Sequence, residues 1–287
     1  MKIEDIKRIC VVGAGNMGHQ ISLCAVLAGY QVKCYDVNPD VLVKANTSSH
    51  KYLADRVSKG KLTQEQADQA LAKLMFTQSI GEAVSDADFV IEAAIEMLEV
   101  KRQLFKEIDS LVPTHTILAT NSSTLVSSLI ADVTRRPEKV CNMHFFNPVL
   151  VMKLVEVVQG PHTSDETAAI TMELCSKLGK ICILLKKEIQ GFLVNRILRA
   201  LAQEALYLSD MKVATPKDID LAVENALGHP MGPFRLMDLT GIDVSYHISM
   251  ERYRASGDPR DKPSPIIVEK FCRKEWGKKT KRGFYIY

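Results

Sequence analysis

Short apolar runs alternate with longer amphipathic segments over the first two thirds of the chain. The short runs are rich in Val, Ile and Leu, as buried strands are, whereas apolar residues in the longer segments recur every three or four positions, as in helices. This alternation predicts an α/β domain with a largely parallel sheet covered by helices. Strands are expected at residues 9–12, 31–35, 89–93, 116–120 and 181–185, with two more in 140–158 on either side of Asn147-Pro148. Helices are expected between them, ending before Gly29 and over 41–75 (with a break at Gly60), 96–110, 125–131 and 165–178.

Strand patterns stop beyond Lys187, and the rest of the chain has helical periodicity only. We therefore expect two domains, an α/β domain over residues 1–188 and an all-helical domain over 189–287. Thr215-Pro216 has the sequence of a helix cap followed by a proline in the first turn. The aromatic residues that close the chain are expected to dock on this second domain. Its helices are expected at 191–210, from Pro216 to Gly228, in two segments punctuated by Gly232-Pro233 and Gly241, and at 264–274.

The composition is that of an ordinary globular protein, with 46% hydrophobic and 25% charged residues in 287. A net charge of +3 is too small to indicate nucleic acid as a partner. The seven cysteines are scattered, odd in number and without a Cys-x-x-Cys pair, so we expect no disulfide framework and no metal site. The sequence begins without a signal-peptide pattern and has no apolar run of membrane-spanning length. A soluble, cytoplasmic protein is expected.

A glycine motif, Gly13-x-Gly15-x-x-Gly18, stands between the first predicted strand and the first predicted helix. In a dinucleotide-binding turn the first glycine allows the tight turn, the second lets the backbone approach a pyrophosphate, and the third allows close packing of helix on strand. Asp36 ends the second strand, where an acid can bind both ribose hydroxyls and would repel a 2′-phosphate. The order of these elements predicts NAD rather than NADP as the cofactor; a glycine-rich turn without nucleotide is the alternative. The predicted cofactor site also includes two residues of the turn, Asn16 and Met17.

The helical stretch 41–75 is longer than the single crossover helix that a dinucleotide-binding fold has at this point. Gly60 interrupts it, and Thr63-x-x-Gln66 has the spacing of a capping box that begins a second helix. We therefore expect an inserted helical hairpin. Its tip is basic, which indicates either a solvated face or an anion-binding surface. The basic residues are Lys51, Arg56, Lys59 and Lys61.

His144 and Glu156 are the two ionisable residues inside the apolar runs of 140–158. An unpaired carboxylate in such a run would cost several kcal/mol, so a nearby imidazole is the expected partner of Glu156. A carboxylate that holds a histidine fixes its tautomer, which is the arrangement of a general base with its orienting group. The alternative is a core histidine bonded to the backbone and a carboxylate at a strand end.

Taken together, these motifs resemble the 3-hydroxyacyl-CoA dehydrogenase family, closest to the short bacterial 3-hydroxybutyryl-CoA dehydrogenases. The resemblance covers essentially the whole chain. It departs from the family pattern at Gln190, where a proline is usual, and at Arg235, where an acid is usual. The matching segments are the glycine motif with Asp36, Glu96 with Lys101, Asn121-Ser-Ser, His144-Phe-Phe-Asn-Pro, Met152-Lys-Leu-Val-Glu156, Gly191-Phe-x-Val-Asn195-Arg, His229-Pro-Met-Gly-Pro233 and Gly283-Phe-Tyr.

The resemblance implies a role for each matching residue. His144 would remove the proton of the substrate 3-hydroxyl while hydride passes to NAD, and Glu156 would orient it. Ser123 and Asn195 would hydrogen-bond the substrate, although a hydroxyl of the segment containing Ser123 could instead cap the helix that follows. Lys59 would meet the phosphates of coenzyme A. The nicotinamide side would be lined by Glu96, Lys101 and Asn121.

The implied activity is NAD-dependent oxidation of (S)-3-hydroxyacyl-CoA to 3-ketoacyl-CoA and its reverse, on short chains. The resemblance also implies an acyl-CoA substrate and a homodimer formed through the C-terminal helical domain. Two alternatives stay open. One is a dehydrogenase of a free hydroxy or sugar acid, similar to L-gulonate 3-dehydrogenase. The other is a non-catalytic NAD-binding protein, as among lens crystallins of this family.

Overall fold

A computed structural model describes residues 1–287 apart from the side chain of Ala255. The chain divides into two compact units, Met1–Leu193 and Val194–Tyr287, and each is described by itself. The first unit is α/β and the second is helical, as the sequence predicts.

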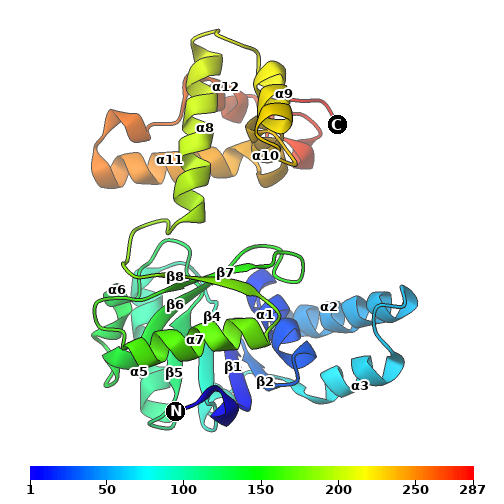
Figure 1. Cartoon of the computed structure of the whole chain (residues 1–287), viewed down its shortest axis with the longest axis vertical. Coiled ribbons are helices and arrows are strands. Elements are labelled where there is room, and N and C mark those ends of the chain that lie inside the picture. The colour runs from blue at the N-terminus through cyan, green and yellow to red at the C-terminus, as the bar shows by residue number, and fades with distance from the viewer. The chain divides into compact units, whose positions relative to one another are not determined.

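The first unit is built on an eight-stranded sheet with the order β3-β2-β1-β4-β5-β6-β7-β8 (Figure 1). Every neighbouring pair is parallel except β6 and β7, which are antiparallel. The largely parallel sheet is therefore confirmed. The strands are β1 (Arg8–Val12), β2 (Gln31–Tyr35), β3 (Leu74–Thr77), β4 (Phe89–Glu92), β5 (Ile117–Thr120), β6 (Val140–Phe145), β7 (Leu154–Val158) and β8 (Ile181–Leu185).

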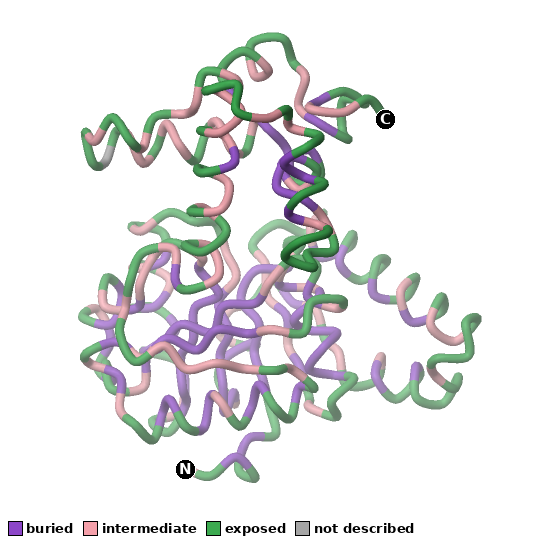
Figure 2. The backbone as a smooth tube through the Cα atoms, turned by 45° about the horizontal axis from the view of Figure 1, so that its top comes forward, coloured by how far each residue is buried: buried purple, intermediate pink, exposed green. Residues whose placement is uncertain are grey.

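Helices cover both faces of this sheet, because its central strands are apolar on both sides. In β1, Ile9 and Val11 belong to one hydrophobic cluster while Cys10 and Val12 belong to another, as the period of two along a strand requires. Figure 2 shows the resulting buried layer along the strands. The helices of this unit are α1 (Asn16–Leu27), α2 (Pro39–Ser58), α3 (Gln64–Ala72), α4 (Ile80–Val84), α5 (Leu98–Leu111), α6 (Ser128–Ala131) and α7 (Asp165–Lys177), with 3-10 turns η1 (Ile3–Asp5) and η2 (Pro137–Lys139).

The inserted hairpin is confirmed as α2 and α3, which extend beside the sheet (Figure 1). The capping box is also confirmed: the Thr63 hydroxyl accepts from the Gln66 amide at 3.1 Å, and the Gln66 side chain accepts from the Thr63 amide at 2.9 Å. The expected continuation of helix to Met75 is wrong. Residues 74–77 form the edge strand β3, which pairs with β2. Four residues are too few to show the alternation of apolar and polar positions that identifies a strand, so this strand is defined by its pairing.

The second unit contains helices only, apart from short bridges in its tail. The Thr215 cap is confirmed, as its side chain accepts from the Asp218 amide. The closing aromatics dock as predicted, because the buried carboxylate of Asp238 accepts the amides of Phe284 and Tyr285, both at 2.9 Å. The helices are α8 (Val194–Asp210), α9 (Pro216–Ala226), α10 (Pro233–Thr240), α11 (Ile242–Ser256) and α12 (Pro265–Cys272), with 3-10 turns η3 (Pro259–Asp261) and η4 (Lys278–Thr280). In the part of the chain that the structure describes, no helix has both the length and the apolar character needed to cross a bilayer.

Candidate active site

The turn between β1 and α1 has the shape of a pyrophosphate cradle. Gly13 has φ +102°, and a Cβ there would lie 2.6 Å from the carbonyl oxygen of Ala93. A Cβ on Gly18 would lie 1.7 Å from the Gly13 carbonyl oxygen, so this position requires glycine for the packing of α1 on β1. A Cβ on Gly15 would meet nothing within 4 Å, and no side chain caps the N-terminus of α1. This open backbone at a helix N-terminus fits the pyrophosphate of NAD.

Asp36 follows β2 and faces the same turn. One carboxylate oxygen accepts the Ala14 amide at 2.9 Å, and the other accepts the Asn38 amide at 2.9 Å. No basic side chain follows it, since residues 37 and 38 are Val and Asn. The two other predicted residues of the turn have different neighbours: the Asn16 side chain donates to the Asn147 side chain at 3.0 Å, and Met17 packs against the hydrophobic core.

The different surroundings of two glycines predict separable effects on stability and on cofactor affinity. Gly18→Ala places a Cβ against backbone and should lower the free energy of unfolding by more than about 3 kcal/mol. Gly15→Ala should leave stability unchanged but weaken NADH binding on the order of ten-fold, about 1.4 kcal/mol, because the methyl group occupies the open approach. Urea unfolding and NADH fluorescence titration measure the two effects. Equal NADH affinity in Gly15→Ala and the unaltered protein would contradict the predicted cradle.

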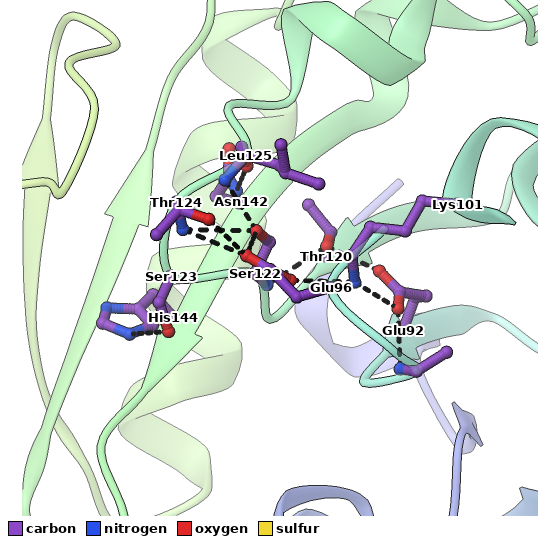
Figure 3. Close-up of polar contacts among 11 residues, drawn as sticks. Glu92, Glu96, Lys101, Thr120, Ser122, Ser123, Thr124, Leu125, Asn142 and His144 are labelled. Atoms are coloured by element: carbon purple, nitrogen blue, oxygen red, sulfur yellow. Dashed lines mark hydrogen bonds and ion pairs between the residues drawn. The ribbon is translucent and has the colours of Figure 1, made fainter. Parts of the chain in front are cut away.

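His144 and Glu156 are brought together as the sequence predicts, because they are paired partners on the antiparallel strands β6 and β7. The Nδ1 atom of His144 lies 2.8 Å from Oε2 of Glu156, and both residues are buried. A carboxylate can only accept, so Nδ1 carries the proton and Nε2 presents a lone pair. Nε2 lies 3.0 Å from the hydroxyl oxygen of Ser123. Figure 3 shows the two side chains facing each other. Three side chains therefore form a carboxylate–imidazole–hydroxyl row.

In the loop after β5, Ser122 makes the hydrogen bonds that hold the turn, so the hydroxyl of Ser123 is available to His144. The Ser122 hydroxyl oxygen accepts the Leu125 amide at 2.8 Å and the Thr124 amide at 3.3 Å, and it donates to Glu96 (Figure 3). The alternative that Ser123 caps the following helix is therefore wrong, since the turn is held by its neighbour. That helix, α6, also begins at Ser128 rather than at Leu125.

Two asparagines fix this loop against β6. The Asn121 side chain accepts the Phe145 amide at 2.9 Å, so the residue predicted beside the nicotinamide also joins β5 to the strand that carries His144. Asn142, which the sequence analysis missed, is buried in β6; its side chain accepts the Ser127 amide at 2.8 Å and donates to the Leu125 carbonyl at 2.9 Å. The signal for it was an amide side chain inside an apolar strand run.

A second polar cluster lies beside the loop, at the ends of β4 and β5 (Figure 3). The Lys101 ammonium is buried, 2.6 Å from Oε1 of Glu92 and 3.3 Å from Oε2 of Glu96. The second oxygen of Glu92 accepts the Thr120 hydroxyl at 2.6 Å. The sequence pattern had not singled out Glu92, although an acidic residue at the end of a buried strand was a signal for it. Lys101 thus bonds two carboxylates, while the side chain of Glu96 is 40% exposed.

The charge state of Glu96 follows from these contacts. Desolvation raises its pKa, but the Ser122 hydrogen bond, the Lys101 ammonium and the Thr124 hydrogen bonds together hold the pKa below its usual value. The carboxylate therefore stays ionised at neutral pH and remains a hydrogen-bond acceptor.

Two predicted substrate residues lie outside this cluster. Lys59 is the C-cap residue that follows α2; its side chain is 59% exposed and its ammonium lies 2.8 Å from the Asp55 carboxylate. Asn195 is in α8, in the second unit, so its contact with the site stays a prediction. Among the described residues, no group of three or more His, Cys, Asp or Glu could hold a metal ion.

Two family models together match nearly the whole chain. The model of the 3-hydroxyacyl-CoA dehydrogenase NAD-binding domain matches residues 8–189, and that of the C-terminal domain matches residues 191–287. A Bacillus subtilis (strain 168) protein named "Probable 3-hydroxybutyryl-CoA dehydrogenase" is 41% identical over 99% of this chain and 98% of its own. The solved structure of (S)-3-hydroxybutyryl-CoA dehydrogenase PaaH1 from Ralstonia eutropha is 35% identical over 99% of each chain, with TM-score 0.91. A solved diketoreductase, titled as acting on dicarbonyl compounds, is 32% identical over 98% of this chain and 99% of its own, with TM-score 0.88. The chain therefore belongs to the family of NAD-dependent 3-hydroxyacyl-CoA dehydrogenases.

Proposed function

We propose that the protein oxidises short-chain (S)-3-hydroxyacyl-CoA, in particular 3-hydroxybutyryl-CoA, and catalyses the reverse reduction. The observation that carries this proposal is the row of Glu156, His144 and Ser123, with distances of 2.8 and 3.0 Å. The short acyl chain is supported by the names of the relatives from Bacillus subtilis and Ralstonia eutropha, which specify 3-hydroxybutyryl-CoA.

In the proposed mechanism, Nε2 of His144 removes the proton of the 3-hydroxyl. Glu156 holds the proton of Nδ1, so that the lone pair of Nε2 faces the substrate, and its negative charge stabilises the imidazolium that forms. Ser123 donates to the substrate oxygen in place of its bond to Nε2. NAD supplies the hydride acceptor when it is bound. In the reductive direction His144 returns the proton as a general acid.

The proposal places coenzyme A at the basic tip of the hairpin, where Lys59 is exposed and can reach a phosphate. Asn195 of the second unit is proposed to bind the substrate. A homodimer through the second unit is proposed as well, because that unit exposes large apolar side chains. These include Ile197, Tyr207, Met211, Leu221 and Leu227.

A dehydrogenase of a free hydroxy or sugar acid is the second candidate function. The likeness to a diketoreductase favours it, since that protein is described as acting on dicarbonyl compounds. The intact row of Glu156, His144 and Ser123 argues against a non-catalytic NAD-binding protein.

The thioester is expected to be the substrate in a direct competition. We expect NADH to be oxidised rapidly with acetoacetyl-CoA and not with free acetoacetate, because the free acid lacks the phosphates that the basic tip would bind. NADPH should replace NADH poorly, because Asp36 repels a 2′-phosphate. The absorbance of the reduced nicotinamide measures all three rates. Turnover of acetoacetate at the rate of the thioester would favour the free-acid candidate, and NADH binding without turnover would favour a non-catalytic protein.

A further inference from the structure

The segment 188–193, which follows β8, is held by the first unit at both ends. At its start, Oε1 of Glu188 accepts the Ser127 hydroxyl at 2.8 Å and the Ser128 amide at 2.9 Å. At its end, the Leu193 amide donates to Oε1 of Glu156 at 3.0 Å. The carboxylate that orients His144 is therefore bonded to this segment as well.

The Glu156 carboxylate uses a different oxygen for each of these two bonds. Oε2 lies 2.8 Å from Nδ1 of His144, and Oε1 accepts the Leu193 amide. Two bonds on two oxygens fix the plane of the carboxylate, and that plane sets the direction in which it holds the imidazole. The backbone at Leu193 thus contributes to the orientation of the proposed base.

Phe192 precedes Leu193 in the segment 188–193 and adopts a backbone conformation that a bulky residue rarely has. Its φ is +49°, and it follows Gly191 with φ +80°. Left-handed conformation in a phenylalanine is unfavourable and persists only where the surrounding structure imposes it. The side chain is fully buried, and the amide donates to the Ile189 carbonyl at 3.0 Å.

The strained backbone places the Phe192 ring against His144. The ring centroids are 5.3 Å apart with an interplanar angle of 55°. Phe146 makes a second tilted contact with His144, at 4.7 Å and 58°. Tilted aromatic contacts at this distance restrict ring orientation and exclude water. The two nitrogens of the imidazole are therefore held by hydrogen bonds, and the ring itself packs against the phenyl rings of Phe146 and Phe192.

We infer that Phe192 is a positioning residue for His144, acting with the Leu193 amide through the His144–Glu156 pair. This inference rests on the proposed role of His144 as acid and base. The phenyl ring of Phe192 has no group that can exchange a proton, so the residue acts on catalysis through the geometry of the pair. Its loss should slow turnover and leave the binding of cofactor and substrate intact.

The first test is the kinetics of Phe192→Ala. We expect kcat for acetoacetyl-CoA reduction to fall on the order of ten-fold, because small misplacements of a catalytic group are costly. The KM for the thioester and the Kd for NADH should not change. Phe192→Leu keeps a buried apolar side chain and should recover most of the lost kcat. Phe192→Gly relieves the positive φ but removes the ring, so it should be as slow as Phe192→Ala.

The second test is a double-mutant cycle with Glu156→Gln. When the pair is already broken by Glu156→Gln, adding Phe192→Ala should lower kcat much less than it does in the unaltered protein. If Phe192 only stabilises the fold, the decreases in kcat caused by Phe192→Ala and by Glu156→Gln should multiply in the double variant. This outcome would overturn the inference. Recovery of full kcat by Phe192→Gly would also overturn it, since the backbone rather than the ring would then matter.

A matched measurement on His144→Ala separates this inference from the proposed function. If His144→Ala is nearly as active as the unaltered protein, the proposed base is wrong and the inference fails with it. If His144→Ala is inactive while Phe192→Ala has normal kcat, only the inference is wrong.

Discussion

His144→Ala is expected to lower kcat for acetoacetyl-CoA reduction by about 10²- to 10⁴-fold, the usual contribution of general acid–base catalysis. The imidazole stands between Glu156 and Ser123, and neither neighbour can replace it. Glu156 is fully buried behind it, and the Ser123 hydroxyl is a poor acid at neutral pH. NADH affinity should be unchanged, because the glycine turn at Gly13–Gly18 has no hydrogen bond to His144 among the described contacts.

The alanine variant also leaves the Glu156 carboxylate buried without its imidazole, so loss of folding must be separated from loss of chemistry. His144→Gln is the matched control, since its amide can still donate to Glu156 while it offers no base. Thermal unfolding should rank His144→Gln as the more stable of the two variants. Both should show a kcat lower by about 10²- to 10⁴-fold in steady-state assays. A decrease in kcat of only a few-fold in a folded His144→Gln protein would exclude the proposed base.

Glu156→Gln should lower turnover through the tautomer of His144. An amide nitrogen facing Nδ1 would donate to it and leave the ring proton on Nε2, where the lone pair is needed. His144 and Glu156 act as a unit. The variant that combines His144→Ala with Glu156→Gln should therefore lose about as much kcat as His144→Ala alone.

The nucleotide turn could be predicted from the sequence because its determinants are local. Gly13, Gly15 and Gly18 stand within one turn, and their roles depend on backbone geometry that any β-turn-α unit imposes. The pairing of His144 with Glu156 could also be predicted from the sequence, since two apolar runs flank a short turn. Antiparallel neighbours joined by such a turn bring their side chains into register.

Other features could not be predicted because they depend on contacts between distant segments. The edge strand β3 has four residues and is defined by its pairing with β2, so it was mistaken for helix. Ser122 and Ser123 are adjacent serines, and only the positions of Glu96 and His144 assign the turn to one and the catalytic row to the other. The contact of Phe192 with His144 depends on a positive φ that no local signal indicates.

Lys101→Met is expected to lower the free energy of unfolding by about 3–5 kcal/mol, because it leaves one partner of a buried ion pair uncompensated. Lys101 is 1% exposed and Glu92 is fully buried, with 2.6 Å between ammonium and carboxylate. Methionine fills most of the lysine volume, so the loss reflects charge rather than a cavity. Urea unfolding followed by circular dichroism measures the change.

The neighbouring residue of the same helix is the matched control. Arg102 pairs with Asp132 at 2.6 Å, but its side chain is 28% exposed and that of Asp132 is 61% exposed. Arg102→Met should therefore lower stability far less than Lys101→Met does, because exposed ion pairs contribute little. If Lys101→Met is no more destabilised than Arg102→Met, the buried pair does not stabilise the fold as argued.

Adding Glu92→Gln to Lys101→Met should restore much of the lost stability. The oxygen of a glutamine can still accept the Ala94 amide, and its amide nitrogen can donate to the Thr120 hydroxyl oxygen, yet the side chain buries no charge. The same double variant tests the predicted role of Lys101 beside the nicotinamide. If stability returns while NADH affinity stays low, the ammonium acts on the cofactor site through Glu96, which it bonds at 3.3 Å. If stability and NADH affinity return together, Lys101 serves the fold, and the cofactor role predicted for it is wrong.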